Sequence, residues 1–408
     1  MVIDKKIVLA DDDKCTGCAA CQQSCTHAAI SMEEDHEGFI FPKINKDKCV
    51  GCGLCVRRCP ELSPIKRLDY SVQKAYAVIS NEYRKQSSSG GAFSLLAGWV
   101  IRQGGVVFGA AYDSRLAVKH IAVDTMADLC KLRGSKYVQS DVSNSYRQVK
   151  SFLANGRKVL FSGTGCQVAG LYAYLDGKRY NGQLFTIDLV CHGVPSLGVF
   201  RCYLSKLSHV LGDRNISGFR FRKLDSWSII PAVQLSKSKW RLLRLSENVY
   251  MDAFFEGITF RESCFHCQYC NTQRIGTFTL ADFWGIGRQG KHFRRNVAAG
   301  VSLVIDNIDM MPTIKSELEK HAYIEERSIE EAVAEQRNLK MPMSRSVKRD
   351  SAVKDLMDRS MSLADFAKKY GYPYRVTLKS AIVGMVKGLI YTLGLYNVYK
   401  TVIYKFGK

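Results

Sequence analysis

Cysteine spacing is the feature that most constrains this chain. Eight of its fifteen cysteines fall within the first 59 residues of 408, in two runs that share the spacing C-x2-C-x2-C-x3-C. The runs are Cys15, Cys18, Cys21, Cys25 and Cys49, Cys52, Cys55, Cys59. Three thiolates two residues apart can wrap one corner of an iron–sulfur cube, but they leave its fourth iron bare. The spacing therefore predicts two [4Fe-4S] clusters, with the last cysteine of each run serving the other cube.

This crossover predicts which thiolates share a cluster. One set is Cys15, Cys18, Cys21 and Cys59, and the other is Cys49, Cys52, Cys55 and Cys25. The pattern is that of a bacterial two-cluster ferredoxin, although Thr26 stands where proline usually follows the first run. Zinc is an alternative, but its sites usually take two separated pairs of ligands. Disulfides are another, but they need an oxidising compartment, and nothing at the N-terminus resembles a signal peptide.

The charge of the chain restricts its partners without naming one. The formal net charge is +21, and fifteen basic against four acidic residues follow from Arg337 onward. Such a surplus attracts polyanions such as anionic lipid, nucleic acid, an acidic protein or a phosphorylated ligand. No nucleic-acid-binding motif accompanies the charge, so we predict no nucleic acid partner. We expect a cytoplasmic protein, with a peripheral position at the inner face of the membrane as an open alternative.

That alternative depends on the tail of the chain. Its most apolar stretch is the twelve residues Gly388 to Tyr399, which is too short to span a bilayer. The tail could lie on a membrane as broken amphipathic helices with tyrosines at the interface, or dock on the core as a helix. The two interpretations stay open.

The middle of the chain has the texture of an α/β domain. Buried-strand patterns at 106–111, 158–162 and 184–190 alternate with apolar helix patterns, and glycine-rich turns lie between them. Strand, glycine-rich turn and helix in repetition predict a mostly parallel sheet with functional turns at the strand ends. Beyond Asp306 the pattern becomes helical and charged.

Seven further cysteines suggest a third metal site. Cys166 and Cys191 each follow a predicted strand, and such turns gather along one edge of a parallel sheet. A third C-x2-C-x2-C run is Cys264, Cys267 and Cys270. A third cluster held by Cys166, Cys191, Cys264 and Cys267 is reasonable, and Cys270 could replace one of these. A zinc half-site that includes His266, or buried free thiols, is the alternative. We interpret Cys130 and Cys202 as inert core residues.

Several motifs together resemble one known family. They are Ser87–Gly91, Leu132–Ser140 (LRGSKYVQS), Phe161–Gly170 (FSGTGCQVAG), Asp188–Ser196 (DLVCHGVPS) and Thr279–Gly285 (TLADFWG). In this order they are similar to the coenzyme F420 hydrogenase/dehydrogenase beta-subunit family, over roughly residues 75 to 300. The resemblance implies FAD, iron–sulfur clusters including the third one, and electron exchange with a two-electron acceptor such as coenzyme F420.

The resemblance also gives the glycine-rich turns a role. Backbone N–H groups at helix N-termini suit the pyrophosphate of FAD. The candidate FAD-binding residues are Ser88, Ser89, Gly90, Gly91, Lys136, Gly163, Thr164 and Gly165. Lys136 could neutralise a phosphate or the reduced flavin, or be a surface lysine. His192 could donate a proton near the flavin, or serve as a structural hydrogen-bonding group. Asp282 and Trp284 are expected to shape the cluster or flavin pocket, with packing as the simpler role for the tryptophan.

The predicted organisation combines an α+β ferredoxin-like domain with an α/β flavin-binding domain. Residues 1–65 form the two-cluster domain, 70–150 and 151–310 resemble the N-terminal and C-terminal parts of the F420 hydrogenase beta subunit, and 311–408 form a helical, basic extension. We predict an FAD- and [4Fe-4S]-dependent oxidoreductase that exchanges electrons with a redox partner protein or ferredoxin and with a small-molecule acceptor. The alternative is an electron-transfer subunit that serves a partner enzyme, for example in a surface-polysaccharide pathway.

Overall fold

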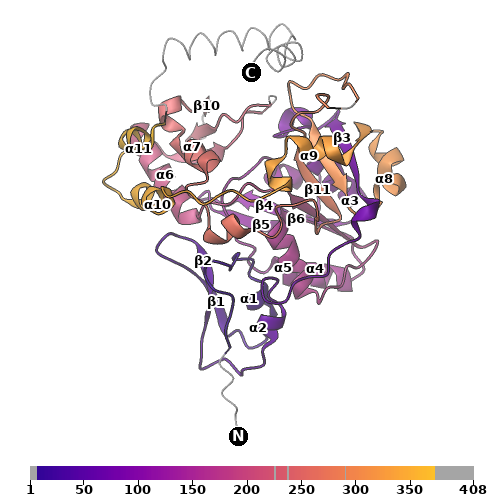
Figure 1. Ribbon diagram of the computed structural model, residues 1–408, viewed down its shortest axis with the longest axis horizontal. Coiled ribbons are helices and arrows are strands. Elements are labelled where there is room, and N and C mark those ends of the chain that lie inside the picture. Colours follow the sequence, from indigo (N-terminus) through magenta and orange to yellow (C-terminus); the bar gives the residue numbers. More distant parts are fainter. Residues whose placement is uncertain (1–6, 225–226, 237–238, 290, 373–408) are drawn as a thin grey trace.

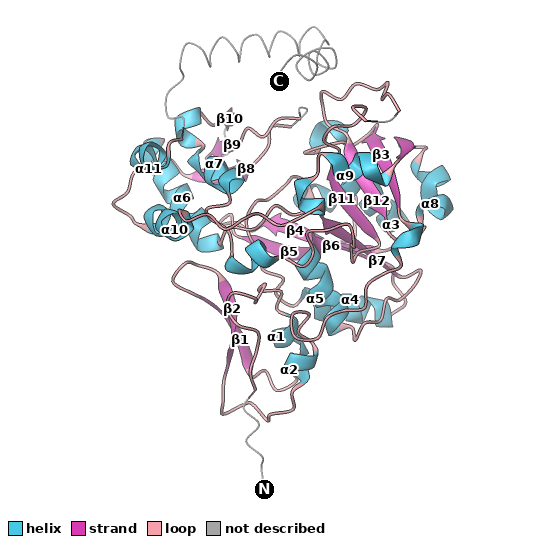
Figure 2. Ribbon diagram, viewed as in Figure 1, coloured by secondary structure: helices cyan, strands magenta, loops and turns pink. Residues whose placement is uncertain are grey.

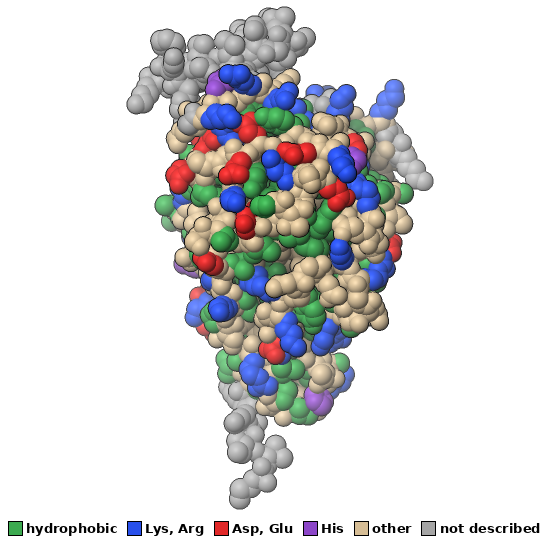
Figure 3. Space-filling view, turned by 90° about the vertical axis from the view of Figure 1, so that its right-hand side faces the viewer, with side chains coloured by type: hydrophobic (Ala, Val, Ile, Leu, Met, Phe, Trp, Pro, Cys, Tyr) green, Lys and Arg blue, Asp and Glu red, His purple; other side chains and the backbone are tan. Residues whose placement is uncertain are grey.

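The computed structural model describes residues 7–372, except 225–226, 237–238 and 290. Of the basic segment that begins at Arg337, residues 373–408, which include the apolar stretch Gly388 to Tyr399, lie outside the described residues. In the part of the chain that is described, no helix is long and apolar enough to cross a membrane. Lys and Arg side chains are interspersed with Asp and Glu over the face drawn in Figure 3.

The cysteine-rich segment forms a small unit below the main sheet (Figure 1). Its hairpin pairs two antiparallel strands, and each of its two short helices begins after a residue in the left-handed backbone region, Ala19 or Gly53. The elements are α1 (Ala20–Ser24), β1 (Ile30–Glu34), β2 (Ile40–Ile44) and α2 (Leu54–Arg57). The tight turns wind the chain around the cysteines, as a two-cluster domain requires.

An eight-stranded sheet forms the centre of the molecule (Figure 2), in the order β13-β3-β12-β11-β7-β6-β4-β5. Its strands are β3 (Lys74–Ser80), β4 (Val106–Tyr112), β5 (Val118–Val123), β6 (Val159–Thr164), β7 (Leu184–Leu189), β11 (Phe278–Asp282), β12 (Ser302–Asp306) and β13 (Ala322–Arg327). Neighbours β4, β6, β7 and β11 pair in parallel, whereas β5, β12 and β13 run against their neighbours. Five of the eight strands, β3 included, therefore point the same way, which confirms the predicted fold class.

Helices cover both faces of this sheet. One face packs on α3 (Ala92–Arg102) and α8 (Met311–Leu318). The other packs on α4 (Ser145–Ala154), α5 (Gly165–Tyr174) and α9 (Ile329–Ala334). Strands such as β6 and β12 are buried along almost their whole length, which explains their continuous apolar sequences. The strands and helices predicted between residues 92 and 190 lie within a few residues of these bounds.

A second core lies beside the sheet. It joins α6 (Leu197–Val210), α7 (Val249–Glu256), α10 (Arg349–Met357) and α11 (Leu363–Tyr370) to a three-stranded antiparallel sheet. The strands of that sheet are β8 (Ile216–Arg220), β9 (Ala232–Leu235) and β10 (Trp240–Leu242). The C-terminal region is mainly helical, as predicted. The sequence pattern missed β13, however, because its alternation of buried and exposed residues is weak among charged side chains.

The cysteine-rich unit is tied to this second core. Arg349 of α10 donates from Nη1 and Nη2 to both carboxylate oxygens of Glu37, each at 2.6 Å, and also to the carbonyl of Phe260. Gly38 packs so closely on α6 that an added Cβ would stand 2.5 Å from the Cα of Gly198. The β1–β2 loop is therefore clamped between α6 and α10.

Candidate redox centres and cavity

The structure brings the first predicted set of thiols together. Burial raises the pKa of the Cys18 thiol well above its usual range, and the thiols of Cys21, Cys15 and Cys59 beside it raise it further. Burial, then Cys15 and Cys59, likewise raise the pKa of Cys21 to about 12. Cys59 comes from the second run, so the geometry has the crossover that the spacing predicts.

The second predicted set lines one cavity. Cys25 from the first run faces Cys49, Cys52 and Cys55 from the second, with the side chains of Ile30, Ile44 and Leu54 around them. Cys52 is exposed, whereas Cys55 is buried. This second group therefore lies closer to solvent than the group around Cys18.

A third group of thiols converges from three segments that are far apart in the sequence. Cys166 begins α5, Cys191 follows β7, and Cys264 and Cys267 lie at a 3-10 turn, Glu262–His266. Burial and the neighbouring Cys267 thiol raise the pKa of both Cys166 and Cys264 to about 12. Burial raises the pKa of Cys191 well above its usual range, helped by Cys264, Cys166 and Cys267. These are the four predicted ligands of the third cluster.

Crowded, buried thiols fit an iron–sulfur cube, because bound iron replaces their protons and compensates for their charge. Among the described residues, no three His, Cys, Asp or Glu side chains meet around a point where one metal ion could sit. A cube spreads four thiolates over four separate irons and does not need such a point. The donor sets therefore suit clusters better than single zinc ions.

Three other cysteines lie outside these sets. Cys270 is buried beside the third group, with its Sγ 3.9 Å from the carbonyl oxygen of Cys191, and it interacts with the Cys267 thiol. It therefore lies where an alternative ligand would have to be. Cys202 is half-buried in α6. Cys130 is exposed on a 3-10 turn, so its interpretation as a core residue was wrong, because a single turn does not bury all its sides.

Helix α5 connects the first group of thiols to the third. Gly170 lies one helical turn after Cys166, and a Cβ added to it would stand 3.0 Å from the Cβ and 3.1 Å from the Sγ of Cys18. Residues four apart on a helix share a face. Cys18 and Cys166 therefore lie along the same face of α5, and the first and third groups of thiols are neighbours.

Arg261 reinforces this junction, although no sequence motif marks it. Its side chain is fully buried, and Nε donates to the carbonyl of Cys15 at 2.6 Å. Nη1 meets the amide oxygen of Gln139 at 3.2 Å, and the guanidinium lies 4.0 Å from the ring centre of Phe41. Its charge also lowers the pKa of the Cys166 thiol, against the larger effect of burial. A positive charge is therefore fixed between two groups of thiols.

A cavity of about 430 Å³ opens at the carboxyl ends of β4, β6, β7 and β11. This is the edge at which open α/β sheets usually bind ligands, and the volume is in the usual range for small-molecule sites. Its wall includes Cys166 and Cys191 of the third group. The predicted site residues on the wall are Ser88, Ser89, Gly91, Lys136, Gly163, Thr164 and His192.

Two of the predicted FAD-binding glycines lie behind that wall. A Cβ on Gly90 would stand 2.1 Å from the carbonyl oxygen of Val78, and one on Gly165 would stand 2.8 Å from the Cβ of Tyr269. Both are glycines because backbone or side chains pack directly on them. Close packing explains these two positions without a ligand contact.

The two glycine-rich turns differ as phosphate sites. The N-terminus of α3 has no side-chain cap, and Gly91 to Ser94 line the cavity. The N-terminus of α5 is closed by a capping box, in which Thr164 and Gln167 satisfy each other's backbone groups. The Thr164 hydroxyl also contacts the Sγ of Cys166 at 3.1 Å. At α3 the Ala92 N–H meets the Oγ of Ser302 at 3.4 Å, but no N-cap side chain closes the turn, so this N-terminus suits a pyrophosphate better than that of α5, which serves the thiol group.

Lys136 and His192 both line the cavity, and both are held by protein groups. The Lys136 ammonium donates to the carbonyls of Arg133 at 2.9 Å, Gly134 at 3.2 Å and Leu132 at 3.3 Å, and burial lowers its pKa to about 7. His192 meets the carbonyl of Phe255 at 3.3 Å through Nε2 and the amide oxygen of Asn338 at 3.1 Å through Nδ1. These contacts favour positioning roles for both side chains.

Asp282 and Trp284 shape the cavity wall, together with two residues that the sequence did not single out. Asp282 accepts from Nη1 of Arg222 at 2.7 Å and from the indole N–H of Trp227 at 2.8 Å. The rings of Trp227 and Trp284 stack with centres 4.8 Å apart. Arg222 lies just beyond β8, far from every motif of the sequence, so only the fold brings it here.

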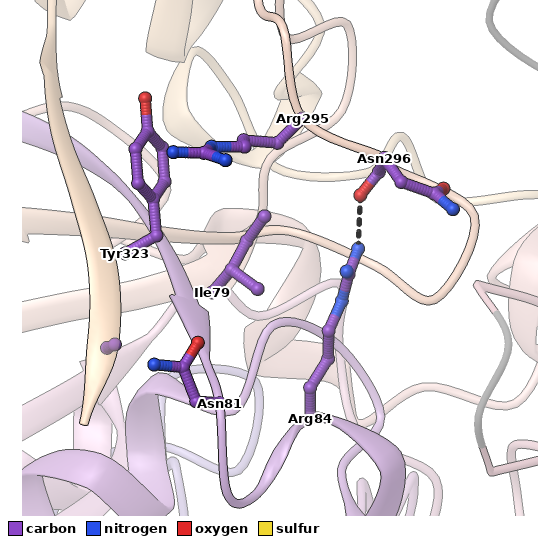
Figure 4. Close-up of a pocket in the computed structure, with 7 residues that line it drawn as sticks. Ile79, Asn81, Arg84, Arg295, Asn296 and Tyr323 are labelled. Carbon is purple, nitrogen blue, oxygen red and sulfur yellow. Dashed lines mark hydrogen bonds between the residues drawn. The ribbon is translucent and has the colours of Figure 1, made fainter.

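A second cavity is lined by residues at the end of β3, at the start of β13 and in the loop around Arg295 (Figure 4). Two arginines line it, and both are engaged. Arg84 donates to the carbonyls of Asn296 at 2.6 Å and Gly300 at 2.8 Å, and Arg295 lies 4.3 Å over the ring of Tyr323. None of the predicted site residues lines this second cavity.

Comparisons with known proteins agree with this arrangement in two steps. Residues 14–62 match the profile of the 4Fe-4S dicluster domain, so the class of the chain is an iron–sulfur protein with two clusters near its N-terminus. Residues 156–332 match the profile for the C terminus of the coenzyme F420 hydrogenase/dehydrogenase beta subunit, which confirms the predicted resemblance. Together the two matches indicate an electron-transfer oxidoreductase.

The other comparisons add little. A search of solved structures returns the F420-reducing [NiFe] hydrogenase complex from Methanosarcina barkeri, with 16% sequence identity and a TM-score of 0.43, over 72% of this chain and 90% of that chain. A search of curated proteins finds no match.

Proposed function

We propose that this chain is an iron–sulfur flavoprotein oxidoreductase that carries electrons between ferredoxin-type clusters and FAD. Its organic partner is a two-electron acceptor or donor such as coenzyme F420. The dicluster match supports the first two clusters, and the beta-subunit match supports F420 chemistry. FAD and the third cluster rest on the residues described above.

One observation carries the proposal: each thiol group has a neighbour in the next, and the third borders the cavity. The Cys55 thiol of the second group raises the pKa of Cys21 in the first. Cys18 packs on Gly170 of α5, Cys166 begins that helix, and Cys166 and Cys191 form part of the cavity wall. Electron transfer between centres needs such close succession. The order from the protein surface inward is Cys52, Cys18, Cys166, cavity.

The chain's own residues define what the cavity would hold. The N-terminus of α3, which has no side-chain cap, suits the pyrophosphate of FAD, with Ser88 and Ser89 beside it. When bound, FAD supplies storage for two electrons that arrive singly, so that an organic molecule can gain or lose a pair. His192 and Lys136 would hold their part of the wall in place through the carbonyls that they bind.

Metal and flavin analysis of protein purified without oxygen tests the proposal. We expect about twelve irons and one flavin per chain. The double variant Cys191→Ala/Cys264→Ala should retain about eight irons and lose transfer from the ferredoxin clusters to flavin. Cys130→Ala, which removes an exposed thiol, is the control and should match the wild type. Protein with full iron that binds no FAD would overturn the flavoprotein part.

A second candidate is an electron-transfer subunit with no substrate of its own. The support for this candidate is the matched profile, which describes a subunit rather than a complete enzyme. Reduced protein alone should reduce F420 or a related acceptor under the first candidate. A requirement for an added partner protein would favour the second.

A further inference from the structure

One buried arginine in the cavity wall has hydrogen-bonding capacity that the protein does not use. Arg222 is only 4% exposed, and its Nη1 donates to Asp282. Its Nε and Nη2 are buried and make no hydrogen bond of ordinary geometry, although the hydroxyl of Tyr137 is near enough to raise the pKa of the guanidinium. Buried donors are nearly always paired, and leaving them unpaired is costly. An unpaired set beside a cavity therefore indicates a ligand.

The two free nitrogens form one edge of the guanidinium group. The N–H bonds of Nε and Nη2 point in nearly the same direction, which makes a fork for two oxygen atoms. Carboxylates and phosphates fill such a fork with two parallel charge-assisted hydrogen bonds. The Nη1 end is occupied by Asp282, so the Nε–Nη2 edge is the one left for a ligand, with Tyr137 as the neighbouring polar side chain.

The fork is held in position before any ligand arrives. Asp282 also accepts from the indole N–H of Trp227, and Trp227 stacks on Trp284 with an angle of 10° between the rings. Charge in the cavity favours an anion as well. Among the described residues that line it, Asp282 is the only carboxylate, against the guanidinium groups of Arg133 and Arg222 and the amine of Lys136, whose pKa burial lowers to about 7.

We propose that the Nε–Nη2 edge of Arg222 binds a carboxylate or phosphate group of the molecule that occupies this cavity. The inference rests on the proposed function in taking that molecule to be FAD or its organic acceptor. The pyrophosphate of FAD already has a suitable position at the N-terminus of α3. The acidic group of the acceptor is therefore the partner that Arg222 selects, so the chain would distinguish acidic acceptors from neutral ones.

Binding measurements on Arg222→Lys test this proposal. Lysine keeps a positive charge next to Asp282 but lacks the fork. The matched control is Arg295→Lys in the second cavity, which makes the same change away from the site. Oxygen-free calorimetry would use three probes: FAD on flavin-free protein, then F420 and inorganic phosphate on FAD-loaded protein. Arg222→Lys should weaken binding of at least one probe about 10- to 100-fold.

Comparing how strongly the three probes bind identifies which molecule carries the oxyanion. Weaker binding of F420 or phosphate alone assigns the fork to the acceptor, and weaker binding of FAD assigns it to the cofactor. Equal affinities of wild type, Arg222→Lys and Arg295→Lys for all three probes would overturn the proposal. If Arg222→Lys loses iron or unfolds, the double variant Arg222→Gln/Asp282→Asn, which removes both charges, is used in its place. Wild-type protein that binds phosphate but no FAD would end the flavoprotein proposal and leave this one standing.

Discussion

Replacing Gly170 by alanine tests the contact between the ferredoxin unit and helix α5 of the main sheet. The new Cβ would stand 2.7 Å from the hydroxyl of Tyr146, 3.0 Å from the Cβ of Cys18 and 3.1 Å from its Sγ. Ordinary contacts begin near 3.5 Å, so the neighbours would have to move by about 0.4 to 0.8 Å. Tyr146 cannot easily do so, because its hydroxyl donates to the carbonyl of Gln167 at 2.8 Å. Cys18 is then the group that moves.

The expected energies follow from two opposing effects. Alanine favours a helix over glycine by about 0.8–1.0 kcal/mol. Overpacking a close-packed site costs about 1–3 kcal/mol. Gly170→Ala should therefore be neutral or destabilising by up to about 2 kcal/mol. Because Cys18 is a predicted ligand, iron content should fall by up to about four atoms per chain.

Gly98→Ala is the matched control, also a glycine in the middle of a buried helix. Its Cβ would meet only the ends of flexible side chains, Arg102 and Met126, at 3.3 Å. It should leave iron unchanged and stabilise the protein by up to about 1 kcal/mol. The assay is urea unfolding without oxygen, with iron and labile sulfide measured on the same samples. Equal stability and equal iron in the two variants would refute the close approach of Cys18 to α5.

Three further predictions concern buried groups. Asp188→Asn should destabilise the fold by about 3–5 kcal/mol in urea unfolding, because it leaves the buried Arg274 charge uncompensated; wild-type stability would contradict this. Burial lowers the pKa of His120 to about 4, so the unfolded chain takes up more protons between pH 6.5 and 4. Stability should then fall by about 2 kcal/mol from pH 8 to pH 5, and His120→Gln should lose part of that dependence. Cys270→Ser should keep the wild-type iron content, whereas Cys267→Ser should lose about four irons; the reverse result would make Cys270 the ligand.

Local patterns predicted much of the architecture. The cysteine spacing indicated both crossed thiol groups, because a cube with four corners leaves few ways to use three neighbouring thiolates. The buried strands and the helices after them were visible as apolar runs between glycine-rich turns, as at Val159–Thr164 and Gly165–Tyr174. The convergence of Cys166 and Cys191 followed from parallel strands that end at one edge.

Long-range partners could not be predicted. Arg261 contacts Gln139, which lies more than a hundred residues away in the sequence. Arg222 contacts Asp282, which lies about sixty residues away. No local pattern marks an arginine whose partner comes from another part of the chain. Gly90 and Gly165 were expected to meet a ligand, but close packing against Val78 and Tyr269 already requires glycine there. A glycine-rich turn alone does not distinguish these two reasons.

The clamp on the β1–β2 loop limits the movement of the cysteine-rich unit relative to the main sheet. With Glu37 gripped by Arg349 and Gly38 pressed on α6, the ferredoxin unit is fastened rather than free to swing. The distance between the thiols of this unit and those near α5 is then fixed by the fold. Under the proposed function, a redox partner would exchange electrons at the outer tip near Cys52, and transfer within the chain would not require a domain to close.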